Sequence, residues 1–304
     1  MSSNLPETKT TTKTETKPKA RPFSFAHLFS RNGHEKQPTP ETKPKGPQKT
    51  VWREYFESAA VTVVMALFGM TFIVQAVKVP TGSMQNTITI GDHLLVNKFI
   101  FAPGESLPFL PQREIKRGDI IVFKYPGNKY NPASDYERPD NKPITTNYVK
   151  RVIGLPGDTI RLEGRSVIVN DQPLPEHQIE AVDHNRKDPL EIKRESARQP
   201  DQTYDVYYSP DGADEDYAIF KHEGNGREIT VPAEKYFVMG DNRNNSEDSR
   251  FWGFVPRELV IGRAMFVYWS YDESAPHSDA PPPLSFISDF LYNTRWSRTG
   301  TMVK

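Results

Sequence analysis

The sequence predicts a mainly β protein that is preceded by one membrane-spanning helix and a disordered N-terminal tail. Short apolar runs separated by turn residues recur after residue 90, which is the pattern of strands in a β domain. One uncharged apolar stretch is long enough to cross a bilayer, and the residues before it are poor in apolar side chains. The 304 residues are therefore expected to divide into a tail, an anchor and a globular β remainder.

The composition argues against several classes of function. The formal net charge is +0 at pH 7, and no basic and aromatic stripe supplies the positive field that nucleic-acid binding needs. The absence of cysteine excludes disulfides, thiolate nucleophiles and cysteine-ligated zinc sites. We expect no nucleic-acid partner, no metal and no cofactor.

The N-terminal part of the chain predicts a tail and an anchor. Residues 1–50 are dominated by Thr, Lys, Pro and Glu and are expected to be disordered. No residue from Ser58 to Val77 is charged, and a helix of roughly 20 residues spans about 30 Å, the thickness of a bilayer core. We therefore assign residues 51–77 to a juxtamembrane segment and one transmembrane helix. The alternatives are a buried core helix and a cleaved secretory signal, although the long polar segment before the stretch disfavours the signal.

The charges of the tail predict the orientation of the anchor. Basic residues outnumber acidic ones before the helix, which is typical of a cytoplasmic segment. Residues 78–304 are then expected on the outer side of the membrane. The segment from Leu284 to Lys304 mixes aromatic residues with cations, so it suits either the membrane interface or an ordinary packing helix.

The globular part has a clear strand pattern. A hairpin is expected where apolar and polar residues alternate on both sides of Glu163-Gly164-Arg165, and residues 171–230 are polar and irregular, which predicts a small inserted subdomain. The predicted strands are His93–Phe101, Ile120–Tyr125, Tyr148–Ile153, Thr159–Leu162, Ser166–Val169, Tyr236–Met239 and Ala264–Trp269.

Ser83 is the first candidate nucleophile. It follows Val79-Pro80-Thr81-Gly82, directly after the predicted anchor. Proline keeps the approach extended, and Gly82 lets the backbone come close to a substrate. An ordinary turn serine is the alternative.

Lysine is a better candidate base than histidine in this chain. Of the seven histidines only His93 lies in a predicted strand, and no Gly-x-Ser-x-Gly segment is present, so a Ser-His-Asp triad has little support. A lysine can serve when burial lowers its pKa from about 10.4. Lys150 and Arg151 are neighbours on a predicted strand, so one of them is expected to point inward. The alternative is a strand-edge lysine that faces water.

A dense polar segment, GDNRNNSEDSRFWGFVP, runs from Gly240 to Pro256. Such density predicts the hydrogen-bonded wall of a site, in which Ser246 orients a neutral lysine amine and Asp248 pairs with Arg250. A solvated surface turn is the alternative.

The segments VPTGSMQNTI, GDHLLVNKF, YVKRVIGLPGD and GDNRNNSEDSR resemble, in order and spacing, those of the bacterial type I signal peptidases. The resemblance runs from the anchor to about Trp269. It implies a signal-peptidase-type antiparallel β-sheet catalytic domain. It also implies a serine endopeptidase that removes N-terminal signal peptides from exported preproteins at the outer face of the bacterial cytoplasmic membrane.

The resemblance also implies roles for individual residues. Ser83 becomes the nucleophile, Lys150 the general base and Ser246 the partner of the lysine amine, while Asp248 and Arg250 match the structural ion pair of the family. Thr81 stands where many Gram-negative relatives have a serine whose hydroxyl helps the Ser83 N–H to form the oxyanion hole. The implied substrate-pocket residues are Val79, Met84, Ile88, Leu94, Tyr148 and Val149.

One departure concerns the turn after the nucleophile. The family commonly has a proline before the threonine, whereas this chain reads Gln85-Asn86-Thr87, which is expected to loosen the turn. The expected partners are preproteins and the lipid bilayer, and the chain is expected to be a single-pass monomer. Two rival functions remain open: a non-enzymatic, membrane-anchored β-domain that binds secreted or envelope proteins, and a self-cleaving serine-lysine protease of the repressor kind.

Overall fold

The computed structural model describes residues 50–102, 112–137, 142–184, 189–212 and 217–304. The chain divides into two units, Met1–Val51 and Trp52–Lys304. Residues 1–49, and with them nearly the whole predicted tail, lie outside the described residues.

The anchor is a helix that ends earlier than predicted. Helix α1 (Val51–Phe68) continues as one π-helical turn, η1 (Gly69–Ile73), and Val51–Ile73 is long and apolar enough to cross a membrane. The next residues form strand β1 (Val74–Lys78), so the prediction that the helix reaches Val77 is wrong.

Two contacts explain the early end of the helix. Strand β1 pairs with β2 (Asp92–Asn97), which buries Val77 in the core of the sheet. The backbone N–H of Lys98 donates to the Ile73 carbonyl at 2.9 Å, and its Nζ donates to the Thr71 carbonyl at 2.8 Å. These bonds satisfy carbonyls at the end of the helix that have no partner within it. Hydropathy alone could not separate the apolar helix from the apolar strand that follows it.

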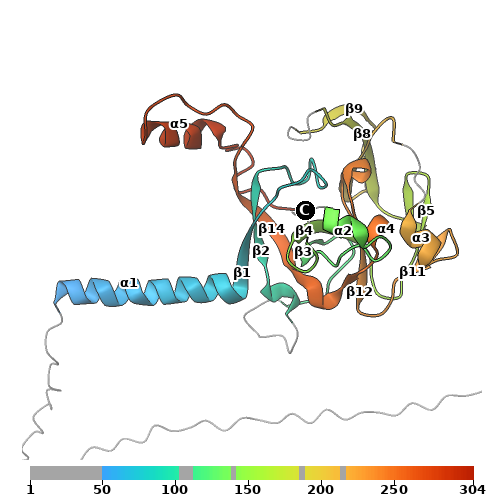
Figure 1. Cartoon of the computed structure of the whole chain (residues 1–304), viewed down its shortest axis with the longest axis horizontal. Coiled ribbons are helices and arrows are strands. Elements are labelled where there is room, and N and C mark those ends of the chain that lie inside the picture. Colours follow the sequence, from blue (N-terminus) through green and yellow to red (C-terminus); the bar gives the residue numbers. More distant parts are fainter. Residues whose placement is uncertain (1–49, 103–111, 138–141, 185–188, 213–216) are drawn as a thin grey trace, which may run out of the picture. The chain divides into compact units, whose positions relative to one another are not determined.

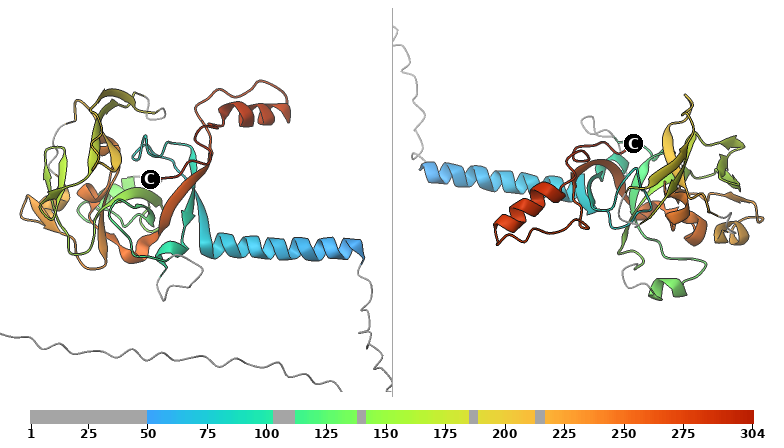
Figure 2. Two further views of the ribbon diagram at one scale, coloured as in Figure 1. Left: turned by 180° about the vertical axis from the view of Figure 1, so that it is seen from behind. Right: turned by 90° about the horizontal axis from the view of Figure 1, so that it is seen from above.

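A seven-stranded antiparallel sheet forms the centre of the fold, with the order β1-β2-β14-β3-β4-β12-β13 (Figures 1 and 2). Strand β14 lies between β2 and β3. It therefore connects β2, which follows the Ser83 loop, to the pair of β3 and β4, and β4 contains Lys150. The remaining strands of this sheet are β3 (Ile120–Lys124), β4 (Asn147–Gly154), β12 (Lys235–Met239), β13 (Val255–Pro256) and β14 (Val260–Ser270).

A four-stranded sheet has the order β11-β5-β6-β7 and contains the predicted hairpin. Its strands are β5 (Thr159–Glu163), β6 (Ser166–Val169), β7 (Gln172–Pro173) and β11 (Glu228–Thr230). Because β11 returns to pair with β5, both predicted limits of the inserted subdomain, 171 and 230, cut through this sheet.

The polar region between these strands builds a sheet of its own, here called the inserted sheet. It consists of β8 (Glu176–Val182), β9 (Glu191–Glu195) and β10 (Tyr204–Tyr208), in the order β10-β8-β9. Strands β8 and β10 run parallel, in contrast to the antiparallel pairs of the main sheet. The sequence signal was weak because β9 is exposed along its whole length and carries no apolar alternation.

Short helices connect the strands. They are η2 (Phe99–Phe101), α2 (Ala133–Glu137), α3 (Ala218–His222), η3 (Arg243–Asn245), α4 (Ser249–Trp252) and η4 (Arg257–Leu259). Helix α5 (Leu284–Asn293) follows the main sheet, and the chain then returns to it: the Val303 N–H donates to the Met265 carbonyl at 2.8 Å and the Val303 side chain is buried.

Strand β4 is covered on both of its faces. Every residue from Val149 to Gly154 is buried, and Lys150 and Arg151 are only 3% and 2% exposed. The prediction that one of the two points inward is therefore too weak, because each side chain enters a different buried layer.

Candidate active site

Ser83 lies in the loop between β1 and β2, and its backbone is fixed by the loop that follows β12. The Asn242 N–H donates to the Ser83 carbonyl at 3.1 Å, and the Asn242 Nδ2 donates to the Gly82 carbonyl at 3.2 Å. A bond of 3.1 Å from the Gln85 N–H to the same Gly82 carbonyl closes the turn. The Ser83 side chain is 8% exposed and therefore has a defined place in the fold.

The side chains of Ser83 and Lys150 meet, although the two residues are 67 positions apart. Lys150 Nζ and Ser83 Oγ are hydrogen-bonded, and both residues are buried. The aromatic ring of Tyr148 lies on the same face of β4, with its centroid 5.4 Å from the lysine nitrogen. This places a potential base within reach of a potential nucleophile.

Burial changes the acid-base behaviour of the lysine. Removal of the amine from water lowers the pKa of Lys150 from 10.5 to about 8, and the positive charge of Arg250 acts in the same direction. The carboxylates of Asp248, Glu247 and Asp241 oppose this fall in the pKa. With a pKa of about 8, roughly a tenth of the Lys150 amines are neutral at pH 7, against far fewer for an ordinary lysine.

Ser246 lies beside the site, but its hydroxyl has another partner. The Ser246 Oγ donates to Asp248 Oδ2 at 2.7 Å. No hydrogen bond joins Ser246 to Lys150 among the described residues, so its role as a direct partner of the lysine amine stays a prediction.

Asp248 and Arg250 form the ion pair that the sequence led us to expect, with 2.7 Å between Asp248 Oδ1 and Arg250 Nε. Burial opposes the charge of Asp248, yet Arg250 and hydrogen bonds from Gly240 and Ser246 keep the pKa of its carboxyl below the ordinary value. Asp248 also caps helix α4 by accepting from the Arg250 N–H. The pair therefore fixes the loop that carries Ser246.

Two hydrogen-bond donors near the nucleophile have no acceptor within the described residues: the Ser83 N–H and the Thr81 hydroxyl. The Thr81 side chain is exposed. Such groups can donate hydrogen bonds to a substrate oxygen that becomes negatively charged during the reaction.

The six predicted pocket residues do not share one surface. Val79, Met84, Ile88, Leu94 and Val149 are buried together in one hydrophobic cluster. Tyr148 packs against a second cluster, which includes Phe123 and Trp252. Their contact with substrate stays a prediction.

Sequence reasoning missed the buried pair behind the site. Arg151 donates to both carboxylate oxygens of Asp241, each at 2.8 Å, and the Thr87 hydroxyl donates to the same carboxylate at 2.6 Å. Arg151 and Asp241 are 90 positions apart, and nothing in the local sequence connects them.

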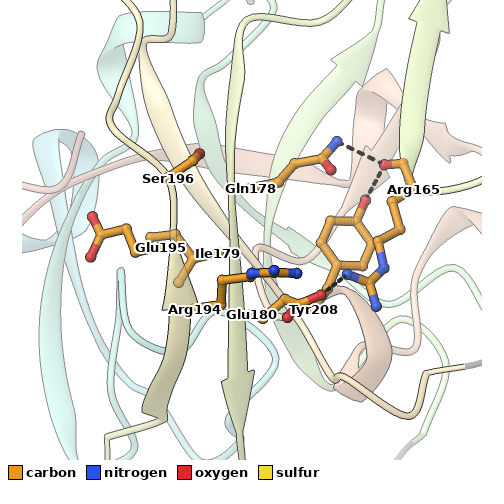
Figure 3. A pocket seen from close by; sticks show the side chains of 8 residues that line it. All are labelled: Arg165, Gln178, Ile179, Glu180, Arg194, Glu195, Ser196 and Tyr208. Atoms are coloured by element: carbon orange, nitrogen blue, oxygen red, sulfur yellow. Dashed lines mark hydrogen bonds and ion pairs between the residues drawn. The ribbon is translucent and has the colours of Figure 1, made fainter.

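Other features of the described residues do not compete with this site. No group of His, Cys, Asp and Glu side chains in that part of the chain has the arrangement of a metal site. A cavity of about 330 Å³ lies at the inserted sheet and contains neither Ser83 nor Lys150 (Figure 3). Its wall consists of Arg165, Gln178, Ile179, Glu180, Arg194, Glu195, Ser196 and Tyr208.

Comparison with known proteins identifies the family. The family described as "Signal peptidase, peptidase S26" matches residues 52–269. A signal peptidase I from Leptolyngbya laminosa is 32% identical over 252 residues, which cover 81% of this chain and 96% of the relative. Signal peptidases I from Pseudomonas aeruginosa and Aquifex aeolicus are 29% and 30% identical and cover 83% and 78% of this chain, which in turn covers 84% and 93% of those proteins. The chain therefore belongs to the signal peptidase family, peptidase S26, and is an enzyme that removes signal peptides.

Proposed function

We propose that Ser83 is the nucleophile and Lys150 the general base of this signal peptidase. The observation that carries the proposal is the hydrogen bond between their two buried side chains. Neutral Lys150 takes the hydroxyl proton while Ser83 Oγ attacks the carbonyl carbon at the cleavage site. The Ser83 N–H and the Thr81 hydroxyl then donate to the oxyanion.

The same pair completes the reaction. Protonated Lys150 returns the proton to the leaving amine, the peptide bond breaks, and the signal peptide stays attached to Ser83 as an ester. A water molecule then loses a proton to Lys150 and attacks the ester, which frees the signal peptide and restores the hydroxyl. The pair Asp248 and Arg250 and the hydroxyl of Ser246 serve as supports for this arrangement.

An extended substrate suits two strand edges near Ser83 that pair with no other strand among the described residues. The first is the outer edge of β1, which is the outermost strand of the main sheet. The second is the edge of β4 before Arg151, because β12 pairs with β4 only from Arg151 onward. We propose that the signal peptide lies along these edges, where main-chain hydrogen bonds accept any sequence and small pockets select small side chains.

The bilayer is the second proposed partner. The apolar side chains of α1 are exposed, with Trp52 at 86%, as expected for a helix that lipid surrounds. Helix α5 also exposes Phe286 and Tyr292, and Trp296 follows it, which supports contact with the membrane interface. We propose a single-pass protein of the cytoplasmic membrane with its tail inside, its domain from β1 to Lys304 outside, and a monomeric state.

Processing of a preprotein tests the proposed activity. The detergent-solubilised protein is incubated with a preprotein, and the new N-terminus of the product is sequenced. We expect cleavage directly after the signal peptide. Binding without cleavage would favour the non-enzymatic β-domain, and cleavage of the enzyme alone would favour the self-cleaving protease.

Protease accessibility tests the orientation. A protease added outside intact spheroplasts is expected to digest the domain after Lys78 and to spare the tail before Arg53. Digestion of the tail in intact spheroplasts would reverse the proposed topology.

A further inference from the structure

Asn86 joins the nucleophile loop to the inserted sheet. Its Oδ1 accepts from the Leu190 N–H at 2.8 Å, and its Nδ2 lies 3.5 Å from the Leu190 carbonyl oxygen. The side chain thus engages both backbone groups of a residue 104 positions away. The turn that the sequence led us to consider loose is therefore tied to a second part of the domain.

The contact rests on a packed part of the inserted sheet. Leu190 precedes β9 directly and is buried in one cluster with Ile179, Ala181 and Tyr207. Burial raises the pKa of the Tyr207 hydroxyl to about 12, and a hydrogen bond with Asn86 opposes this rise. A residue that meets buried partners is held more firmly than one that meets a mobile surface loop.

The inserted sheet also holds the loop that follows β12. The Tyr207 N–H donates to the Asp241 carbonyl at 2.8 Å, and Tyr207 forms an isolated parallel bridge with Asn242. The Ser209 N–H donates to Asn244 Oδ1 at 2.9 Å. Because Asn242 in turn holds the backbone of Ser83, the inserted sheet contacts both loops of the site.

The position of Asn86 makes this contact relevant to the nucleophile. Asn86 is three residues after Ser83, and the residues two positions before and after it, Met84 and Ile88, are anchored in the core of the main sheet. The loop is therefore fastened from the core side by apolar packing and from the other side by Asn86. A displacement of about 1 Å in a reacting group can cost about 10²-fold in rate.

We propose that Asn86 is a positioning residue that keeps Ser83 Oγ within reach of Lys150 by fastening the nucleophile loop to the inserted sheet. This inference rests on the proposed function, because it takes Ser83 and Lys150 as the reacting pair. It gives the inserted sheet a role in catalysis that is separate from substrate contact.

Two variants and a matched control test the role. Asn86→Ala removes both bonds to Leu190, whereas Asn86→Asp keeps the acceptor for the Leu190 N–H. Asn131→Ala is the control, because the Asn131 side chain is exposed and makes no hydrogen bond with another described residue. The kcat, the KM, the pH profile and the thermal unfolding of each full-length protein are measured with a signal-peptide substrate.

We expect Asn86→Ala to lower kcat by about tenfold, with KM within about twofold, since a misplaced nucleophile impairs the transition state more than binding. The kcat of Asn86→Asp should be at least about threefold higher than that of Asn86→Ala, because the bond to the Leu190 N–H is retained. The midpoint of the pH profile should stay where the wild type has it, because Lys150 remains buried.

Three results would overturn the inference. The first is a kcat of Asn86→Ala equal to that of Asn131→Ala, and the second is a midpoint of the pH profile displaced toward the pKa of an ordinary lysine. The third is that Asn86→Ala and Asn86→Asp lose the same amount of kcat as each other and the same amount of thermal stability as each other. The last two would show that the residue maintains the fold and not the geometry of the nucleophile. Ser83→Ala in the same assay separates the claims. Activity in Ser83→Ala would refute the proposed function, whereas an inactive Ser83→Ala beside a fully active Asn86→Ala would refute only the role of Asn86.

Discussion

Gly240 approaches Ser83 so closely that a Cβ at position 240 would lie 2.4 Å from the Ser83 carbonyl oxygen. The same Cβ would lie 2.3 Å from the Ser246 hydroxyl oxygen. The absence of a side chain thus lets the end of β12 pack against the nucleophile loop. A backbone carbonyl cannot rotate aside as the tip of a flexible side chain can, so the site requires glycine here.

Gly240→Ala is expected to displace the nucleophile loop. We predict a loss of about 1–3 kcal/mol in the free energy of unfolding, typical of an overpacked core. The kcat should fall by at least about tenfold, because the displaced atoms carry Ser83. Gly69→Ala is the control, since nothing lies within 4 Å of a Cβ at that position. Wild-type kcat in Gly240→Ala would show that the two loops separate without cost.

The pH dependence of the reaction should follow Lys150. Because the neutral amine is the reactive form and its pKa is about 8, kcat/KM should rise as the pH rises through about 8 and then level off. A profile measured from pH 6 to 10 checks this. A midpoint near pH 6.5 would point to histidine instead.

The same lowered pKa should affect stability. The unfolded chain holds the lysine proton up to about pH 10.4, while the folded chain gives it up near pH 8, so the contribution of this group to stability rises with pH between these values. Lys150→Met should remove that rise. Denaturant unfolding of wild type and variant at pH 8 and pH 10 measures the difference, and an unchanged rise in the variant would assign it to other groups.

Thr81→Val tests the oxyanion hole by keeping the shape of the side chain and removing its hydroxyl. Loss of one such donor usually costs about 10²- to 10³-fold in kcat. We expect a loss of this size with little change in KM, and near-normal activity in Thr81→Ser. If Thr81→Val stays within about threefold of wild type, backbone N–H groups alone hold the oxyanion.

The C-terminal segment should stabilise the loop behind the nucleophile. Arg298 pairs with the buried carboxylate of Asp92 at 2.5 Å and donates to the Thr87 carbonyl at 3.3 Å. Arg298→Ala leaves Asp92 without this partner and should cost about 2–4 kcal/mol of unfolding free energy. Arg227→Ala, at an exposed arginine whose side chain makes no hydrogen bond with another described residue, is the control. Equal thermal unfolding of the two variants would contradict the prediction.

Several strands of the main sheet and of the four-stranded sheet were predictable because their apolar residues are local and regular. The hairpin around Gly164 and the runs at β3, β4, β6 and β12 stand out for this reason. The end of the anchor was not predictable, because Val74 to Val77 carry no charge, like the helical residues from Ser58 onward, and β1 is recognised only by its pairing with β2. The inserted sheet depends on the long-range parallel pairing of β8 with β10, which leaves no local signal.

The site divides in the same way. Ser83 and Lys150 could be singled out from the segments that surround them, and their contact then required the fold. The pair of Arg151 with Asp241 and the attachment of Asn86 to Leu190 join residues that are distant in the chain, and each depends on burial that a single sequence does not reveal. The Ser246 hydroxyl donates to Asp248, a bond that a charged acceptor strengthens, and its predicted contact with the lysine amine stays a prediction.

The central claim is that Ser83 and Lys150 act as one unit, and a double-mutant cycle tests it most directly. The kcat of Ser83→Ala, Lys150→Ala and the double variant is measured with one preprotein, after thermal unfolding has shown that each variant is folded. Residues that act together lose their effect together, so each single variant should lose at least about 10³-fold and the double variant no more than either single one. A single variant that keeps its kcat within about tenfold of wild type, or losses that multiply in the double variant, would contradict the claim.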